Sequence, residues 1–304
     1  QAYFNVLRQQ SLNRTYLQEE QALSEQLKMM NAKLQQGLLA RSDVSEANAQ
    51  YQNARANRIS GQVQQMLAQE QLNRFIGHNP NQGLAVLRTD VVYQPPVPAR
   101  LDDWLQLAQT HNLSIQQARL QRQYADDNRR VEKAALYPQL NALATYGYTK
   151  QSPDTLISTN GAFDQIGLEL SWNLFNGGQT QTSIKKAVAQ LDQAQAQLDA
   201  AERSASVEVK QAFLQLQTDQ SKLDARQAAM RSAEQVSQAS LASYNEGLKT
   251  MVDVLLAQRN AFSAKQEYVN AQYDYLINVL KLKAAVGQLS EEDLVQMNTW
   301  LGND

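Results

Sequence analysis

QIGLELSWNLFNGG, residues 165–178, alternates apolar and polar side chains without interruption over its first ten positions. The apolar set is Ile166, Leu168, Leu170, Trp172 and Leu174, and between them lie Gln165, Gly167, Glu169, Ser171 and Asn173. A period of two is typical of a β-strand with one apolar and one polar face. Most of the remaining sequence has a helical pattern, so the role of this strand decides the fold.

A second stretch, PQLNALATYGYT at residues 138–149, alternates in the same way and breaks the rule only at Leu143. The intervening residues 150–164 are polar and contain proline and glycine, which predicts a loop. Each strand has about 10–12 residues, and a transmembrane β-strand needs about 9–11. A soluble hairpin lying on helices is the alternative, but nothing nearby offers a core for so many apolar side chains. Because two strands cannot close a barrel, a membrane role requires further strands.

The composition favours thin helix contacts over a thick globular core. The 304 residues are 43% hydrophobic, much of it alanine, and the mean hydropathy is −0.53. A net charge of −2 argues against a nucleic-acid binder driven by phosphate contacts. The lack of cysteine excludes disulfides and thiolate metal sites. The sequence has no run of 18 apolar residues that would predict a transmembrane helix.

An internal repeat relates the first part of the sequence to the last third at a fixed offset of 210 residues. Gly37 matches Gly247, and the same offset aligns Leu38 with Leu248, Asp43 with Asp253, Ala47 with Ala257, Leu72 with Leu282 and Gly77 with Gly287. Each copy predicts a helical hairpin. In the second copy a long arm covers about 179–246, Gly247 makes the turn, and Thr250 or Asp253 begins the arm that ends near residue 285.

The arms carry heptads with small residues in one column, Ala47, Ala54, Gly61 and Ala68. Small residues every seven positions allow helix backbones to approach closely. An ordinary antiparallel coiled coil explains this pattern, and so does a wall of helices with neighbours on both sides. Residues 101–136 predict one further helix of about half the length of the long arm.

Three segments of this chain resemble the TolC-like outer-membrane efflux proteins, most closely the enterobacterial type, and the resemblance extends over essentially the whole chain. They are LSWNLFNGGQTQTSIKKA at 170–187, SYNEGLKTMVDVLLAQRNAFSAKQEYVNAQYDYLINVLKLKAAVGQLSEEDL at 243–294, and the weaker NAKLQQGLLARSDVSEANAQYQNARANRI at 31–59. The resemblance implies a mainly α fold. Long antiparallel coiled-coil hairpins would form a periplasmic α-barrel, and two strands would be contributed to a trimeric transmembrane β-barrel.

The same resemblance divides the chain into six segments. They are the first hairpin at 1–77, an equatorial segment at 78–100, a half-length helix leading to the membrane at 101–137, the strand pair with its loop at 138–176, the second hairpin at 177–287 and an equatorial C-terminal segment at 288–304. Each family protomer has four strands, so we expect the chain to lack an N-terminal half-helix and a first strand pair.

The implied function is an exit duct for tripartite efflux pumps and type I secretion, located in the outer membrane and extending into the periplasm. Its implied partners are two further copies in a homotrimer, a membrane-fusion adaptor, an inner-membrane pump and outer-membrane lipid, with no cofactor. A periplasmic adaptor and a coiled-coil scaffold are the alternatives. An adaptor usually has one hairpin, whereas this sequence has two in register and a strand pair between them.

The resemblance also assigns residues at the turn of the first hairpin. Ser42 and Asp43 match the hydroxyl and the acid of a network that holds the family's closed tip, and Tyr244 matches a tyrosine of the second turn. Each has a simpler interpretation from the residues alone. Asp43 can be a first-turn acid favoured by the helix dipole, and Tyr244 can be a packing residue of its helix.

Two residues of the second turn carry the implied gate. Asp253 matches the first of two aspartates that ring the pore, and Leu256 stands at the second position. Lys249 occupies the place of an arginine in the best-known members, and lysine lacks the bidentate fork of arginine. Asp253 can also be only a first-turn acid, and Lys249 only a solvated turn residue.

The sequence predicts no enzyme. His78 and His111 lack partners at metal-ligand spacing. GLKT at 247–250 resembles the end of a phosphate-binding loop, but the earlier glycine is missing and the turn joins two helices. We therefore expect no catalytic residues, no cofactor and no metal site.

Overall fold

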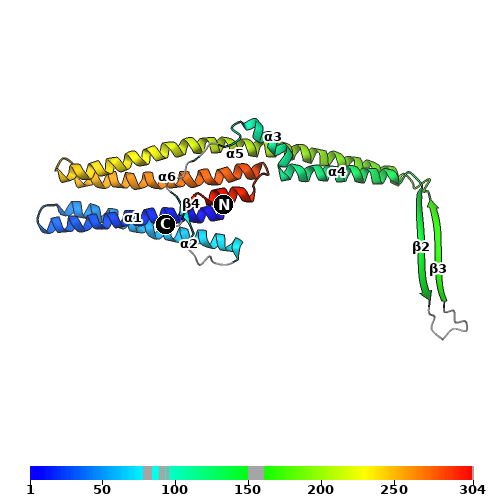
Figure 1. Cartoon of the computed structure of the whole chain (residues 1–304), viewed down its shortest axis with the longest axis horizontal. Coiled ribbons are helices and arrows are strands. Elements are labelled where there is room, and N and C mark those ends of the chain that lie inside the picture. The colour runs from blue at the N-terminus through cyan, green and yellow to red at the C-terminus, as the bar shows by residue number, and fades with distance from the viewer. Residues whose placement is uncertain (78–83, 89–92, 94–95, 150–160, 303–304) are drawn as a thin grey trace. The chain divides into compact units, whose positions relative to one another are not determined.

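A computed structural model describes residues 1–77, 84–88, 93, 96–149 and 161–302. The chain divides into two compact units (Figure 1). We call residues 1–108 with 206–304 the hairpin unit, and residues 109–205 the strand unit. Helices dominate both units, which confirms the predicted mainly α class with long antiparallel hairpins.

The first hairpin consists of α1 (Ala2–Gln35) and α2 (Arg41–Ile76). The predicted column of small residues on α2 is buried. At Gly61 the Tyr16 ring of α1 packs closely against α2, because a β-carbon at Gly61 would lie 2.6 Å from Cδ2 of Tyr16. The small residues thus serve the close helix contact that the heptad pattern predicted.

The second hairpin consists of α5 (Gln179–Asn245) and α6 (Met251–Ala285), within a few residues of the predicted bounds. Helix α5 continues without a break for 67 residues, which is about 100 Å at about 1.5 Å per residue. Helix α6 lies along α1 (Figure 1). Arg8 forms an ion pair with Asp274 at 2.8 Å, and the hydroxyls of Ser11 and Tyr273 are 2.9 Å apart.

The largest apolar cluster of the hairpin unit joins α5 and α6 and includes Trp104, whose indole N–H donates to the Pro98 carbonyl at 2.7 Å. After α6 the short helix α7 (Glu291–Asn298) is capped by Ser290. Strand β1 (Val86–Leu87) then pairs with β4 (Leu301–Gly302). This pairing joins the segments 78–100 and 288–304, although 78–83, 89–92, 94–95 and 303–304 lie outside the described residues.

The prediction of a single helix over 101–136 is wrong in one respect, because the segment forms two helices. Helix α3 (Leu101–His111) ends before Asn112, and α4 (Leu113–Ala134) begins after it. The Asn112 side chain accepts a hydrogen bond from the Ile115 backbone N–H at 3.1 Å and so caps α4. Asparagine is among the best N-cap residues, and here this local preference outweighs the continuing apolar pattern.

The predicted strand pair is present in the strand unit, with different bounds. Strand β2 (Gln139–Thr149) pairs antiparallel with β3 (Gly161–Ser171), from Gln139 opposite Ser171 to Thr149 opposite Gly161. The strand therefore begins inside the predicted loop and stops before Trp172. Pro138, which has no N–H to donate, precedes β2, so no partner strand continues opposite Trp172. Residues 150–160 of the loop lie outside the described residues.

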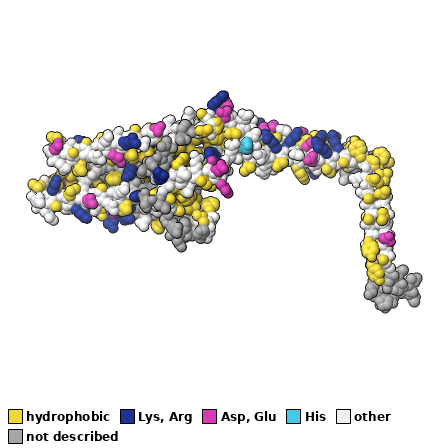
Figure 2. All heavy atoms as spheres, viewed as in Figure 1, with side chains coloured by type: hydrophobic (Ala, Val, Ile, Leu, Met, Phe, Trp, Pro, Cys, Tyr) yellow, Lys and Arg dark blue, Asp and Glu magenta, His cyan; other side chains and the backbone are white. Residues whose placement is uncertain are grey.

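The apolar face of this sheet has no protein cover among the described residues. Ile166 is 88% exposed, and Leu140, Leu168 and Leu170 are exposed as well. Figure 2 shows hydrophobic side chains along the visible face of the strand pair. Helix α4 lies beside the first part of α5, where Arg122 Nε donates to Gln195 Oε1 at 3.2 Å. No helix in the described part of the chain is long and apolar enough to cross a membrane.

Candidate functional site

The two hairpin turns have the same backbone geometry. At the first turn Gly37 has φ +74°, its N–H bonds to the Leu34 carbonyl at 2.9 Å, and the Leu38 N–H bonds to the Lys33 carbonyl at 2.9 Å. At the second turn Gly247 has φ +78°, and the same two bonds recur at 3.0 and 2.8 Å. This pair of bonds is the Schellman motif, which needs glycine because of the positive φ. The repeat inferred from sequence is therefore a structural repeat.

Asp253 belongs to a capping box at the start of α6. Thr250 accepts the Asp253 N–H at 3.3 Å, while Asp253 Oδ2 accepts the Thr250 hydroxyl at 2.6 Å and the Thr250 N–H at 3.0 Å. The hydroxyl bond, then the N–H bond, lower the pKa of the exposed Asp253 carboxyl below its ordinary value, and the nearby Lys249 charge lowers it further. Asp253 is thus held ionised at the end of the hairpin.

The first turn lacks this box. The offset of 210 places Ala40 where Thr250 lies, and α2 has no side-chain cap. Asp43 occupies the third position of α2, and the Ser42 hydroxyl lies 3.4 Å from Asp43 Oδ1, at the limit of a hydrogen bond. Since Ala40 has no hydroxyl, the Asp43 carboxylate is not tied to its own helix start as Asp253 is.

Tyr244 lies between the two hairpins and is half-buried. The Lys33 ammonium, in the last turn of α1, donates to the Tyr244 hydroxyl at 3.3 Å and lies 4.7 Å from the centre of its ring. The contact is therefore a hydrogen bond combined with a cation–π interaction. The sequence analysis missed Lys33. No signal in the sequence indicated it, because the contact joins residues 211 positions apart.

Lys249 contacts its own hairpin. Its ammonium donates to the Ser240 hydroxyl at 2.8 Å, and Ser240 is only 1% exposed. No hydrogen bond or ion pair within the described chain joins Asp43 to Tyr244 or to Lys249. The five predicted residues thus all lie at the two turns. Tyr244 contacts the first hairpin through Lys33, and not through Asp43.

The turns rest on an apolar cluster shared by both hairpins. Its buried members are Leu23, Met30, Ala47, Ala54, Met251, Val254 and Leu255, and Tyr244 packs against them. Gln26 of α1 donates to the Met251 sulfur at 2.7 Å, while its own side-chain oxygen has no hydrogen-bond partner among the described residues. Leu256, one turn beyond Asp253, is 46% exposed and stays outside this cluster. The cluster holds the two turns together within one chain.

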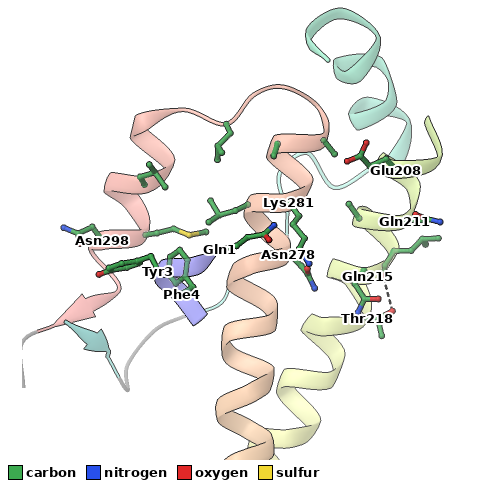
Figure 3. Close-up of a pocket in the computed structure, with 18 of the residues that line it drawn as sticks. Gln1, Tyr3, Phe4, Glu208, Gln211, Gln215, Thr218, Asn278, Lys281 and Asn298 are labelled. Carbon is green, nitrogen blue, oxygen red and sulfur yellow. Dashed lines mark hydrogen bonds between the residues drawn. The ribbon is translucent and has the colours of Figure 1, made fainter. Parts of the chain in front are cut away.

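An open groove of about 1370 Å³ lies among α5, α6 and α7 (Figure 3). Tyr3, Phe4 and Met297 supply apolar lining, and Glu208 of α5 and Lys281 of α6 also line the groove. None of the five predicted residues lines it. His78 lies outside the described residues, and the His111 ring nitrogen lies 2.6 Å from the Thr110 hydroxyl. The described residues include no group of three histidine, aspartate or glutamate side chains placed to hold a metal ion.

Comparison with known proteins identifies the family. Residues 104–288 match the sequence profile of the outer membrane efflux protein family. The chain belongs to that family. Its fold and its location in the outer membrane follow from this membership. The outer membrane efflux proteins are channels rather than enzymes.

Individual relatives agree. The chain is 33% identical to outer membrane protein TolC of Escherichia coli (strain K12) over 99% of its length, and it spans 62% of that relative. It is 26% identical to the alkaline protease secretion protein AprF of Pseudomonas aeruginosa, covering 97% of this chain and 61% of AprF. The crystal structure of outer membrane protein VceC from Vibrio cholerae superposes with a TM-score of 0.75 at 22% identity, covering 94% of this chain and 68% of VceC.

Proposed function

We propose that this outer membrane efflux protein is one protomer of a homotrimeric exit duct. The duct passes drugs or proteins from an inner-membrane pump and a periplasmic adaptor to the exterior. The observation that carries the proposal is the exposed apolar face of β2 and β3, which has no protein cover within the described chain. Lipid is the natural partner of such a face, since the outward side of a membrane barrel is apolar.

The segments of the chain take the following parts in this proposal. Residues 1–77 and 177–287 provide the two hairpins of a periplasmic α-barrel, and 101–137 lead to the membrane. The strand pair with its loop, 138–176, enters a β-barrel that other strands must complete. The segments 78–100 and 288–304 form an equatorial belt, in keeping with the pairing of β1 and β4.

The hairpin turns form the closed tip of the duct in this proposal. Asp253 of three protomers would ring the pore, because its carboxylate is held ionised and exposed by Thr250. Asp43, with Ser42, and Lys249 would join neighbouring protomers. Asp43 is suited to this role because no cap ties it to its own helix. Tyr244, through Lys33, would hold the two hairpins of one protomer together.

The oligomer is the first test. Full-length protein should leave the outer membrane only with detergent, and light scattering of the detergent complex should give the mass of three chains. A periplasmic adaptor or a coiled-coil scaffold would remain in solution without detergent. A monomeric mass in mild detergent would reject the shared barrel.

A further inference from the structure

The register of the strand pair sorts its side chains onto two faces. Directly opposed residues of an antiparallel pair lie on the same face. One face holds the pairs Leu140–Leu170, Ala142–Leu168, Ala144–Ile166 and Tyr146–Asp164, and the other holds Gln139–Ser171, Asn141–Glu169, Leu143–Gly167, Thr145–Gln165 and Gly147–Phe163. The first face also holds Tyr148–Ala162 and is apolar apart from Asp164 and the hydroxyls of its two tyrosines. The second face also holds Thr149–Gly161 and is polar or small apart from Leu143 and Phe163.

Glu169 is the charged residue of the polar face among the described strand residues. It is exposed, and within the described chain no lysine or arginine forms an ion pair with it. It lies two residues before Ser171, where β3 ends, so the carboxylate is about 7 Å from that end of the strand. Asp164 carries the same charge on the opposite, apolar face.

We infer that Glu169 provides a ring of negative charge inside the barrel, which favours cationic over anionic solutes in the duct. The inference rests on the proposed function, because it requires the apolar face to meet lipid and the polar face to meet water. Three copies related by the axis of a trimer would place three carboxylates at one level of the lumen. Rings of acidic side chains are a general means of selecting cations in pores.

The size of the effect follows from distance and screening. Gly167 is two residues from Glu169 on the same face, about 7 Å along the strand. A unit charge at about 7 Å, in water at about 0.1 M salt, changes the local concentration of a monovalent ion by a factor of about 1.7. The ratio of a cationic to an anionic solute therefore changes by about threefold at this position.

Thiol labelling can measure this ratio, because the chain contains no cysteine of its own. A cysteine at position 167 has room, since a β-carbon there meets no atom within 4 Å. The measurement compares Gly167→Cys with Leu168→Cys in full-length protein embedded in outer-membrane vesicles. Cationic and anionic methanethiosulfonate reagents are applied, and the labelling rate of each is recorded at about 0.1 M salt.

Three outcomes are possible, and each decides. The expected result is labelling of Gly167→Cys but not of Leu168→Cys, with a cationic-to-anionic rate ratio that falls about threefold when Glu169→Gln is added. The ratio should change much less when Asp164→Asn is added, because Asp164 is farther from position 167 and on the other face. Equal labelling of both cysteines, labelling of neither, or labelling of Leu168→Cys alone would reject the lipid-facing barrel and the ring with it. Selective labelling with a ratio that Glu169→Gln leaves unchanged would overturn the ring alone and leave the barrel intact.

Discussion

Replacing Lys33 with methionine removes its polar contact with Tyr244, which joins the two hairpins near their turns in addition to the apolar cluster. The hydrogen bond to Tyr244 is long at 3.3 Å, so we place its net contribution near the low end, about 0.5 kcal/mol. A cation–π contact at 4.7 Å adds about 0.5–1 kcal/mol at a partly exposed site. Each protomer therefore loses about 1–1.5 kcal/mol of closed-state stabilisation, and a trimer about 3–4.5 kcal/mol if its three tips open together.

Tyr244→Phe separates the two parts of this contact. It removes the hydroxyl but keeps the ring under the Lys33 ammonium, so it should cost a trimer about 1.5 kcal/mol. A free-energy change of about 1.4 kcal/mol corresponds to a tenfold change in an equilibrium constant. Open events should therefore become about tenfold more frequent in Tyr244→Phe, and about 100-fold or more in Lys33→Met.

Single-channel recording of the full-length protein in planar bilayers measures this frequency. Lys28→Met is the matched control, since Lys28 is an exposed lysine of the same helix and has no ion pair within the described chain. Its open frequency should equal that of the unchanged protein. Equal open frequencies in Lys33→Met and Lys28→Met would refute the role of Lys33. A larger effect from Tyr244→Phe than from Lys33→Met would refute the division of the contact energy into a hydrogen-bond part and a cation–π part.

Three further predictions concern the turns and the hairpin contact. Lys249→Ala should raise the single-channel conductance, because the closing network loses a cation, and an unchanged conductance would place Lys249 outside the network. Asp253→Ala should weaken block by trivalent cations applied from the tip side. In the unchanged protein this block should persist as the pH falls to 3.8, the ordinary aspartate value, since the folded-state pKa of Asp253 is depressed and its charge is lost only at lower pH; block that disappears near pH 5 would contradict this. Gly61→Ala should lower the free energy of unfolding by about 1–3 kcal/mol, because the added methyl meets the Tyr16 ring at 2.6 Å. The thermal unfolding midpoint should fall accordingly. A midpoint equal to that of the unchanged protein would show that Tyr16 moves aside freely.

The sequence predicts the hairpins well because their signals are local and repeated. Gly37 and Gly247 need positive φ, and the offset of 210 carries one turn onto the other. The heptad columns predict the buried small residues of α2 because a fixed period keeps them on one side. Thr250 is one of two residues named for the start of α6, and the capping box uses both.

The errors arise where a local preference or a long-range contact outweighs the pattern. Asn112 interrupts a helix whose apolar pattern continues, because its side chain caps α4. The alternation that ends at Leu174 extends past the strand, because pairing stops where Pro138 precedes the partner strand. Lys33 and Tyr244 are 211 residues apart, and no local pattern connects a lysine with a tyrosine at that separation.

The central claim is that the exposed apolar face of the strand pair belongs to a trimeric duct through the outer membrane. Conductance of the purified full-length protein in planar bilayers tests it most directly. The account predicts discrete, uniform current steps whose frequency rises in Lys33→Met. A protein that inserts into the bilayers and produces no steps, in the unchanged form and in Lys33→Met alike, would contradict it.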